Sequence, residues 1–301
     1  MKASAWILAA WMTAAGAVAA VVVTTGGARA DEPHPAEASA AAAKSEPAPA
    51  VSTPAPAARD AAATPAAPAD SCEVPSYLLT TEARLARVAE AIQTRRRLDI
   101  LVVGSASSLL AGPDGASGSY PARLEAALRE RLSGVTVNVA VVLQVKKTAE
   151  EVVPVLEKQA KDRKPTLVIW QTGTYDALKS VDPEDFRAAV ESGLAALAAA
   201  GTDAVLMNLQ YSPRMETMIT VAPYLDNIRV GAEEHGVPLF DRFGMMRYWN
   251  ESGRFDLFNT SHGLALAKQV HDCLGQTLAA FVVDAAHSAA DAPDDEHRIQ
   301  H

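Results

Sequence analysis

Two serines that directly follow an apolar run are well placed for nucleophilic chemistry. Ser105 and Ser107 come after residues 98–103, a stretch that is apolar except for Asp99 and is followed by Gly104. A serine hydroxyl attacks an ester when a histidine takes its proton and a carboxylate orients that histidine. Acyl transfer is therefore the first chemistry to consider. The alternative is structural, because hydroxyls at the start of a turn or helix commonly cap backbone N–H groups.

Histidine and aspartate partners for such a serine occur at several points along the chain. His262 precedes a predicted helix, and His271 lies within that helix beside Cys273. A histidine packed inside a helix is more often structural than catalytic, so His262 is the better candidate for the base. Asp176 and Asp256 are the carboxylates that could orient the base.

Other features bear on ligands and cofactors. Lys146 and Arg214 lie in loops and could contact an anionic sugar or phosphate, although a solvated surface charge is the alternative. The net charge is −9 and the basic residues are scattered, so no nucleic-acid-binding face is indicated. The glycines after residue 103 do not follow the G-x-G-x-x-G pattern, and the terminal histidines lack the spacing of metal ligands. We predict neither a cofactor nor a metal.

The hydropathy pattern indicates an alternation of strands and helices that could position these residues. Short unbroken apolar runs are typical of strands buried on both faces. Predominantly apolar runs occupy residues 98–103, 135–143, 166–171, 202–209 and 238–240. Helical periodicity occupies residues 81–95, 121–132, 148–162, 183–200, 222–235, 243–249 and 263–283.

This order of elements predicts one α/β domain over residues 71–284, with a five-stranded parallel sheet between two helical layers. In such a sheet the ligand lies outside the carboxyl ends of the strands. The loops expected at that edge are residues 104–119, 144–147, 172–179 and 210–215.

The two ends of the chain differ in composition from this domain. Lys2, an apolar run over residues 5–23 and Ala-Arg-Ala at 28–30 are typical of a signal peptide spanning residues 1–30. An uncleaved membrane anchor is the alternative. Residues 31–70 are almost wholly Ala, Pro, Ser, Glu and Thr, which predicts a disordered linker, and residues 285–301 read as a disordered tail. We therefore expect an exported protein, periplasmic or extracellular.

The chain contains two cysteines, Cys72 at the start of the domain and Cys273 in its last predicted helix. In an oxidising compartment an even number of cysteines indicates a disulfide. A Cys72–Cys273 bond would join the entry of the domain to its final helix, and two buried free thiols are the alternative.

Three segments in order resemble the SGNH or GDSL hydrolase superfamily, whose members are esterases, lipases and carbohydrate deacetylases on a flavodoxin-like three-layer sandwich. They are GSAS at 104–107, YPARL at 120–124 and WQTGTYD at 170–176. The resemblance implies a flavodoxin-like fold here, with Gly173 and Tyr175 at the ligand site.

The same resemblance implies that the catalytic positions have changed. Ala106 stands where the family has its nucleophilic serine, residues 143–147 contain no glycine for the oxyanion site, and Tyr175 replaces the oxyanion asparagine. For the last block, one register places His262 and Ala265 on the family's Asp and His. Another places Asn259 and His262 there.

Two functions follow from this comparison. The first is a catalytically impaired domain that binds a cell-envelope saccharide, such as an acylated one, or another envelope partner through the old substrate cleft. The alternative is an active esterase of the carbohydrate O-acetyl type. In it Ser105 or Ser107 would be the nucleophile, His262 or His271 the base, and Asp176 or Asp256 the carboxylate that orients the base. The oligomeric state is not predicted.

Overall fold

A computed structural model describes residues 72–258 and 263–290 of the 301-residue chain. The predicted signal peptide, the linker, residues 259–262 and the last eleven residues lie outside these ranges, and so do the candidates Asn259 and His262. Among the described helices, none combines the length and the apolar character needed to cross a membrane.

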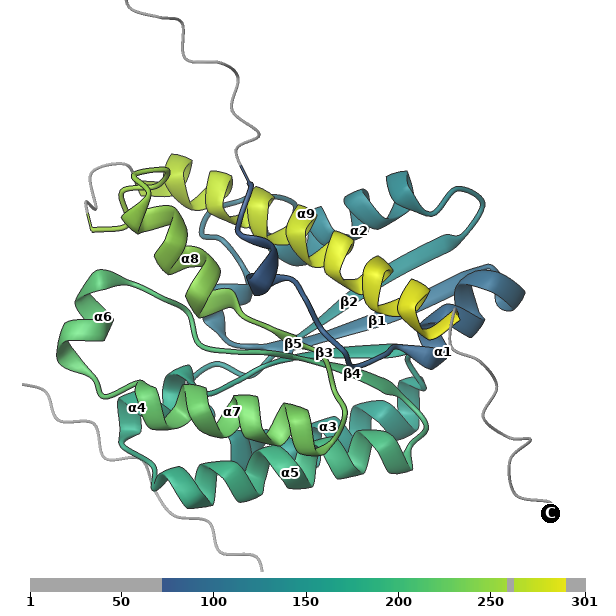
Figure 1. Cartoon of the computed structure of the whole chain (residues 1–301), viewed down its shortest axis with the longest axis horizontal. Coiled ribbons are helices and arrows are strands. Elements are labelled where there is room, and N and C mark those ends of the chain that lie inside the picture. The colour runs from purple at the N-terminus through teal and green to yellow at the C-terminus, as the bar shows by residue number, and fades with distance from the viewer. Residues whose placement is uncertain (1–71, 259–262, 291–301) are drawn as a thin grey trace, which may run out of the picture. The chain divides into compact units, whose positions relative to one another are not determined.

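Five strands form one parallel sheet in the order β2-β1-β3-β4-β5, as predicted (Figure 1). The strands are β1 (Arg97–Gly104), β2 (Thr136–Leu143), β3 (Leu167–Gln171), β4 (Asp203–Met207) and β5 (Leu239–Phe240). Because all strands run the same way, their carboxyl ends meet at one edge of the sheet.

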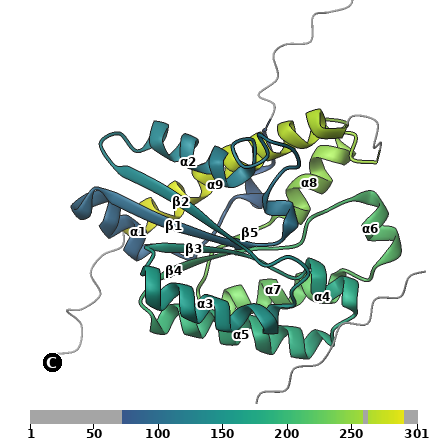
Figure 2. The ribbon, with the colours of Figure 1, turned by 180° about the vertical axis from the view of Figure 1, so that it is seen from behind.

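Helices cover both faces of the sheet and complete the predicted three-layer sandwich (Figures 1 and 2). One layer contains α3 (Ala149–Arg163), α5 (Pro183–Ala199) and α7 (Ala222–Glu234). The other contains α1 (Ala86–Glu90), α2 (Tyr120–Arg131), α8 (Arg242–Glu251) and α9 (Gly263–Ala290). Short helical segments are η1 (Ser76–Leu78), η2 (Ala91–Arg95), η3 (Ala106–Ser108), α4 (Thr174–Lys179) and α6 (Pro213–Met218).

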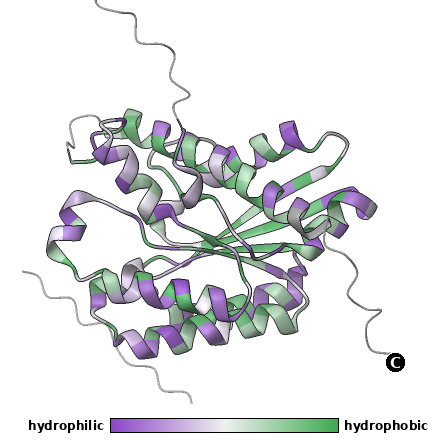
Figure 3. Ribbon diagram, in the orientation of Figure 1, coloured by the Kyte–Doolittle hydropathy of each residue, from purple (hydrophilic) through white to green (hydrophobic). Residues whose placement is uncertain are grey.

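The central strands are buried on both faces because helices cover both sides of the sheet. Figure 3 shows them as a hydrophobic band. All five residues of β3 are buried, and its last residue, Gln171, is polar. A buried amide must find hydrogen-bond partners, so the end of β3 is a place where polar groups gather.

Two helix boundaries differ from the prediction. The helix expected from residue 81 begins at Ala86, because the carboxylate of Asp203 accepts hydrogen bonds from the backbone N–H groups of Arg87 and Val88 and caps the helix there. The last helix continues to Ala290, so placing the start of the tail at residue 285 was wrong. Ala285 is buried and its carbonyl accepts a hydrogen bond from Leu85, which holds the extra turn against α1.

The predicted disulfide is confirmed. Cys72 and Cys273 are bonded across a sequence separation of 201 residues, with their Cα atoms 4.9 Å apart. The bond attaches the entry of the domain to α9. It also suggests an oxidising environment.

The disulfide should contribute measurably to stability. We expect the Cys72→Ala/Cys273→Ala variant to lose about 2–5 kcal/mol of unfolding free energy, because the bond restricts the unfolded chain over a long loop. Urea denaturation of both proteins, with and without reductant, checks this. Reductant should lower the stability of the wild type and leave the double variant unchanged; equal stability of the two proteins without reductant would contradict the expected role.

Candidate functional site

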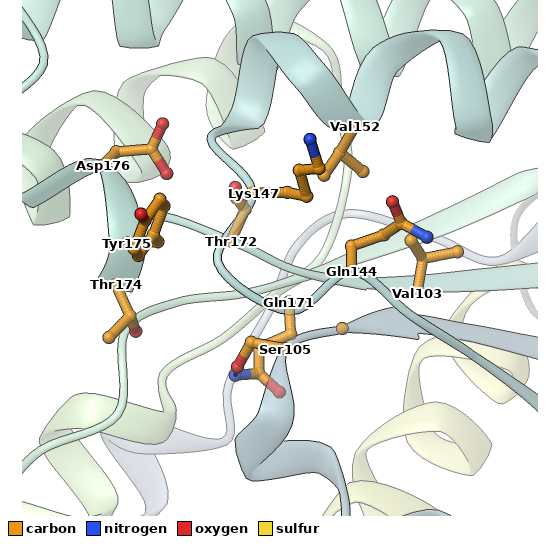
Figure 4. A pocket seen from close by; sticks show the side chains of 12 residues that line it. Val103, Ser105, Gln144, Lys147, Val152, Gln171, Thr172, Thr174, Tyr175 and Asp176 are labelled. Atoms are coloured by element: carbon orange, nitrogen blue, oxygen red, sulfur yellow. Dashed lines mark hydrogen bonds between the residues drawn. The ribbon is translucent and has the colours of Figure 1, made fainter. Parts of the chain in front are cut away.

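A small pocket opens at the carboxyl ends of β1, β2 and β3, at the edge where the sheet topology places a ligand (Figure 4). The space available to the centre of a water molecule is about 20 Å³, which is room for one or two waters. A substituent of a larger ligand fits such a space, whereas a whole sugar ring does not. The lining residues are Val103, Gly104, Ser105, Gln144, Lys147, Val152, Gln171, Thr172, Gly173, Thr174, Tyr175 and Asp176.

The amide of Gln171 connects the two sides of this site. Its Oε1 accepts hydrogen bonds from the Ser108 hydroxyl at 2.8 Å and from the Tyr120 hydroxyl at 3.3 Å. Its Nε2 donates to the hydroxyl oxygens of Ser105 at 3.0 Å and Ser107 at 2.8 Å. The amide therefore uses both its acceptor and its donor group to fix four oxygen atoms.

The backbone at the end of β1 places the two candidate serines side by side. Ser105 is extended and caps η3, its Oγ accepting a hydrogen bond from the backbone N–H of Ser107 at 3.4 Å. The two hydroxyl oxygens lie 3.1 Å apart. Between them Ala106 is exposed to solvent. The predicted capping role is confirmed for Ser105.

Gly104 makes this arrangement possible through a close approach. A Cβ atom at Gly104 would lie 2.1 Å from the Ser108 Oγ, which no side chain can tolerate. The absence of a side chain lets the buried Ser108 reach Gln171 directly. The glycine that ends the strand is thus required by the polar cluster beneath the serines.

A buried arginine approaches the serine pair from α8. Arg242 is 1% exposed, and its Nη1 donates to the Ser107 Oγ at 3.2 Å. Its guanidinium lies over the Tyr120 ring, 5.8 Å from the ring centre. Asp241 caps α8 by accepting from the Gly244 N–H at 2.8 Å, which fixes the start of the helix that carries the arginine.

His271 packs against the start of α2 and not against a serine hydroxyl. Its Nδ1 accepts a hydrogen bond from the backbone N–H of Tyr120 at 3.0 Å, so the proton of the neutral ring is on Nε2. Burial and the nearby charge of Arg242 lower the pKa of His271 to about 3. A ring of such low basicity that already uses its lone pair is poorly suited to activate a serine at neutral pH.

Asp176 lines the pocket, but its carboxylate is hydrogen-bonded to the backbone. Its Oδ1 accepts a hydrogen bond from the N–H of Ala149 at 2.8 Å, at the first turn of α3. Burial raises the pKa of Asp176, and hydrogen bonds from backbone N–H groups oppose that effect. The carboxylate therefore joins α4 to α3, with no described histidine bonded to it.

The predicted ligand-binding residues are brought together only in part. Gly173 and Tyr175 line the pocket, and Gly173 has a φ of +90°, which suits glycine at the start of α4. Lys146 is exposed and is not among the lining residues, whereas Lys147 is, in an ion pair with Glu151 at 2.7 Å. Arg214 lies over the Phe258 ring at 5.6 Å and is also absent from the lining.

Sequence reasoning missed two residues at the centre of the site, Gln171 and Arg242. A polar residue at the end of the apolar run 166–171 was the available signal for Gln171. For Arg242 the sequence offered none, since an arginine at the start of a helix is ordinarily exposed. In the parts of the chain that the structure describes, no three His, Cys, Asp or Glu side chains form a group that could hold a metal.

Comparison with known proteins assigns the chain to a family. The sequence matches the model of the Non-GDSL lipase-like family over residues 71–288. The chain therefore belongs to that family, which agrees with the predicted resemblance to lipases and esterases. A search of curated proteins found no match.

Several solved structures align with the chain at low sequence identity. TesA is 19% identical with a TM-score of 0.48, covering 60% of this chain and 99% of its own. The psychrotrophic esterase EstA from Pseudoalteromonas sp. is 16% identical with a TM-score of 0.48, covering 62% and 96%. The acetyl xylan esterase AlAXEase is 14% identical with a TM-score of 0.49, covering 62% and 98%.

The environment of His271 predicts a pH dependence of stability. The pKa falls from 6.5 to about 3 on folding, so between these values the unfolded chain binds more protons than the folded chain. The contribution of His271 is complete above about pH 6.5 and is lost as the pH falls toward 3. We expect His271→Asn, whose amide oxygen can still accept from Tyr120, to lose less stability between pH 7 and pH 4 than the wild type.

Urea denaturation at pH 7, 5 and 4 measures this difference. The matched control is His235→Asn, which replaces an exposed histidine at the end of α7 and should follow the wild-type curve. Parallel curves for the wild type and His271→Asn would show that His271 titrates normally in the folded protein.

Proposed function

We propose that this member of the Non-GDSL lipase-like family binds a cell-envelope saccharide at the pocket beside β1, β2 and β3 without hydrolysing it. The lining supports this proposal with amide, hydroxyl and phenol groups, which hydrogen-bond sugars, contributed by Gln144, Thr172, Thr174 and Tyr175. A substituent such as an acyl group would enter the pocket, and the sugar would lie outside it.

The single observation that carries the non-hydrolytic part is the way in which the serine oxygens are used. Ser107 Oγ accepts hydrogen bonds from Gln171 at 2.8 Å and from Arg242 at 3.2 Å, and neither group can take a proton at neutral pH. A nucleophile needs a base within hydrogen-bond reach. The resemblance to the SGNH or GDSL hydrolases also implies that Ala106 stands at the position of the nucleophile, which supports a site that holds a ligand without cleaving it.

An esterase is the second candidate, and a specific contact favours it. The positive charge of Arg242 beside Ser107 would stabilise a serine alkoxide if a base removed the proton. His262 would have to be that base, and it lies outside the described residues. In this alternative the substrate is a small ester such as an O-acetylated saccharide.

We also propose that the protein is exported, to the periplasm or to the extracellular space. The Cys72–Cys273 bond supports this, because structural disulfides persist in oxidising compartments. Fractionation of the producing cells, followed by detection of the chain, tests the proposal. Recovery in the cytoplasm with both thiols reduced would contradict it.

Covalent labelling separates the two functions. We expect the purified full chain to form no adduct with a fluorophosphonate probe in intact-mass spectrometry, because no described residue bonded to Ser105 or Ser107 can act as a base. Hydrolysis of a short-chain nitrophenyl ester should stay at the level of Ser105→Ala, Ser107→Ala and His262→Ala. An adduct that disappears in one serine variant and in His262→Ala would establish the esterase.

Calorimetry tests binding directly. We expect saturable binding of the full chain to at least one of two probes, an acetylated xylooligosaccharide or an oligogalacturonate, with the mass of the bound sugar unchanged afterwards. Thr174→Val, which removes one lining hydroxyl, should weaken that binding. The absence of binding to both probes would contradict the proposed function.

A further inference from the structure

The hydrogen bonds of Ser105 and Ser107 leave at least one of the two hydroxyl protons without an acceptor. Ser105 Oγ accepts from Gln171 at 3.0 Å and from the Ser107 N–H at 3.4 Å, and Ser107 Oγ accepts from Gln171 at 2.8 Å and from Arg242 at 3.2 Å. A hydroxyl has two lone pairs and one proton, so each serine has only its O–H left to offer. The 3.1 Å contact between the two oxygens uses at most one of the two protons.

At least one O–H donor therefore needs an acceptor, and the hydrogen bonds among the described residues supply none for it beyond the pair itself. Ser105 lines the pocket, so the pocket is where such an acceptor would lie. Outside the pair, the hydrogen-bond partners of the two oxygens are Gln171 and Arg242, and both are donors. The two hydroxyls are thus arranged as donors toward a ligand group that only accepts hydrogen bonds.

Arg242 adds an uncompensated positive charge behind these donors. It is fully buried, its Nε has no hydrogen-bond partner, and no ion pair joins it to a carboxylate among the described residues. Burial of a charged group without a counter-charge is costly, and the start of a helix is the end where a cation is disfavoured. The arginine is therefore poorly explained as a contribution to stability.

The surroundings of Arg242 agree with a net positive environment. It faces the Tyr120 ring, and its charge helps to keep His271 neutral. The pocket also contains Lys147, which is paired with Glu151, and Asp176, whose carboxylate is turned to the Ala149 N–H. Of these charged groups, Arg242 is the one that hydrogen-bonds the serine pair.

We propose that Ser105 and Ser107, supported by Arg242, bind a carboxylate of the ligand, so that the saccharide recognised is an acidic one that carries uronate groups. A carboxylate has acceptor sites only, fits the small volume of the pocket and supplies the missing counter-charge. Arg242 is a positioning residue in this site, because it acts on the ligand through Ser107. The choice of an acidic saccharide rests on the proposed binding function, whereas the carboxylate site itself can be tested without any saccharide.

Nuclear magnetic resonance of the full chain tests the carboxylate site with sodium acetate as the probe. We expect saturable shifts of the backbone resonances of Ser105 and Ser107 and of the side-chain resonances of Gln171 and Arg242. Acetamide, which has the same shape but no charge, should cause none. Equal shifts with both probes, or no shift with acetate, would overturn the inference whether or not a saccharide binds.

Calorimetry with oligogalacturonate and with its methyl-esterified form tests the ligand class. The wild type should bind the acidic form at least tenfold more tightly, and Arg242→Met should lose at least tenfold in affinity for it. The matched control is Arg247→Met, which removes an exposed arginine of the same helix and should bind normally. Equal affinity for the acidic and esterified forms would reject the carboxylate while leaving saccharide binding in place.

Thermal denaturation distinguishes a ligand-directed arginine from a structural one. Replacement of a buried, uncompensated charge by an apolar side chain of similar volume is expected to keep or raise the melting temperature. Arg242→Met should therefore be at least as stable as the wild type while binding less. A variant that melts lower and binds oligogalacturonate as well as the wild type would overturn the assignment.

Discussion

The rest of the site depends on the side-chain amide of Gln171, which joins two pairs of hydroxyl groups. On one side it accepts from the hydroxyls of Ser108 and Tyr120, and on the other it donates to Ser105 and Ser107. Gln171 is buried, so solvent has little access to its amide, and an unpaired amide there would be costly. The requirement to satisfy one amide therefore fixes the turn after β1 and the start of α2 together.

The charges around this amide follow from the same packing. Arg242 reaches Ser107 from α8, and His271 reaches the start of α2 from α9, so two helices of one layer meet the end of β1. Cys273, which attaches α9 to the entry of the domain, is only two residues from His271. The disulfide, the neutral histidine and the buried cation thus belong to one continuous region. This region holds the serine hydroxyls as donors.

The fold could be predicted well from the sequence, and the contacts of the site residues could be predicted less well. Apolar runs and helical periods are local signals, so the parallel sheet, its layers and the edge that carries the site could be predicted from them. The cysteine pairing followed from having only two cysteines. The position of the serine pair followed from the end of the first strand.

What the sequence did not reveal depends on contacts between distant residues. Arg242 is 135 residues from Ser107, and no local pattern indicates that a helix start will be buried against a serine. Asp203 caps α1 from more than a hundred residues away, which moved the start of that helix. Asp176 appeared suited to orient a base, and only the packing of α4 on α3 shows that it binds a backbone N–H.

The central claim is that the Ser105 and Ser107 hydroxyls are held as donors by Gln171 and Arg242. The most direct measurement is a crystal structure of the full chain soaked with oligogalacturonate, at a resolution that defines each hydrogen-bond distance. We expect a carboxylate oxygen about 3 Å from one or both serine oxygens, with the Arg242–Ser107 bond retained. A Ser107 oxygen turned away from Gln171 and bonded to a histidine nitrogen would contradict the claim and indicate a hydrolase.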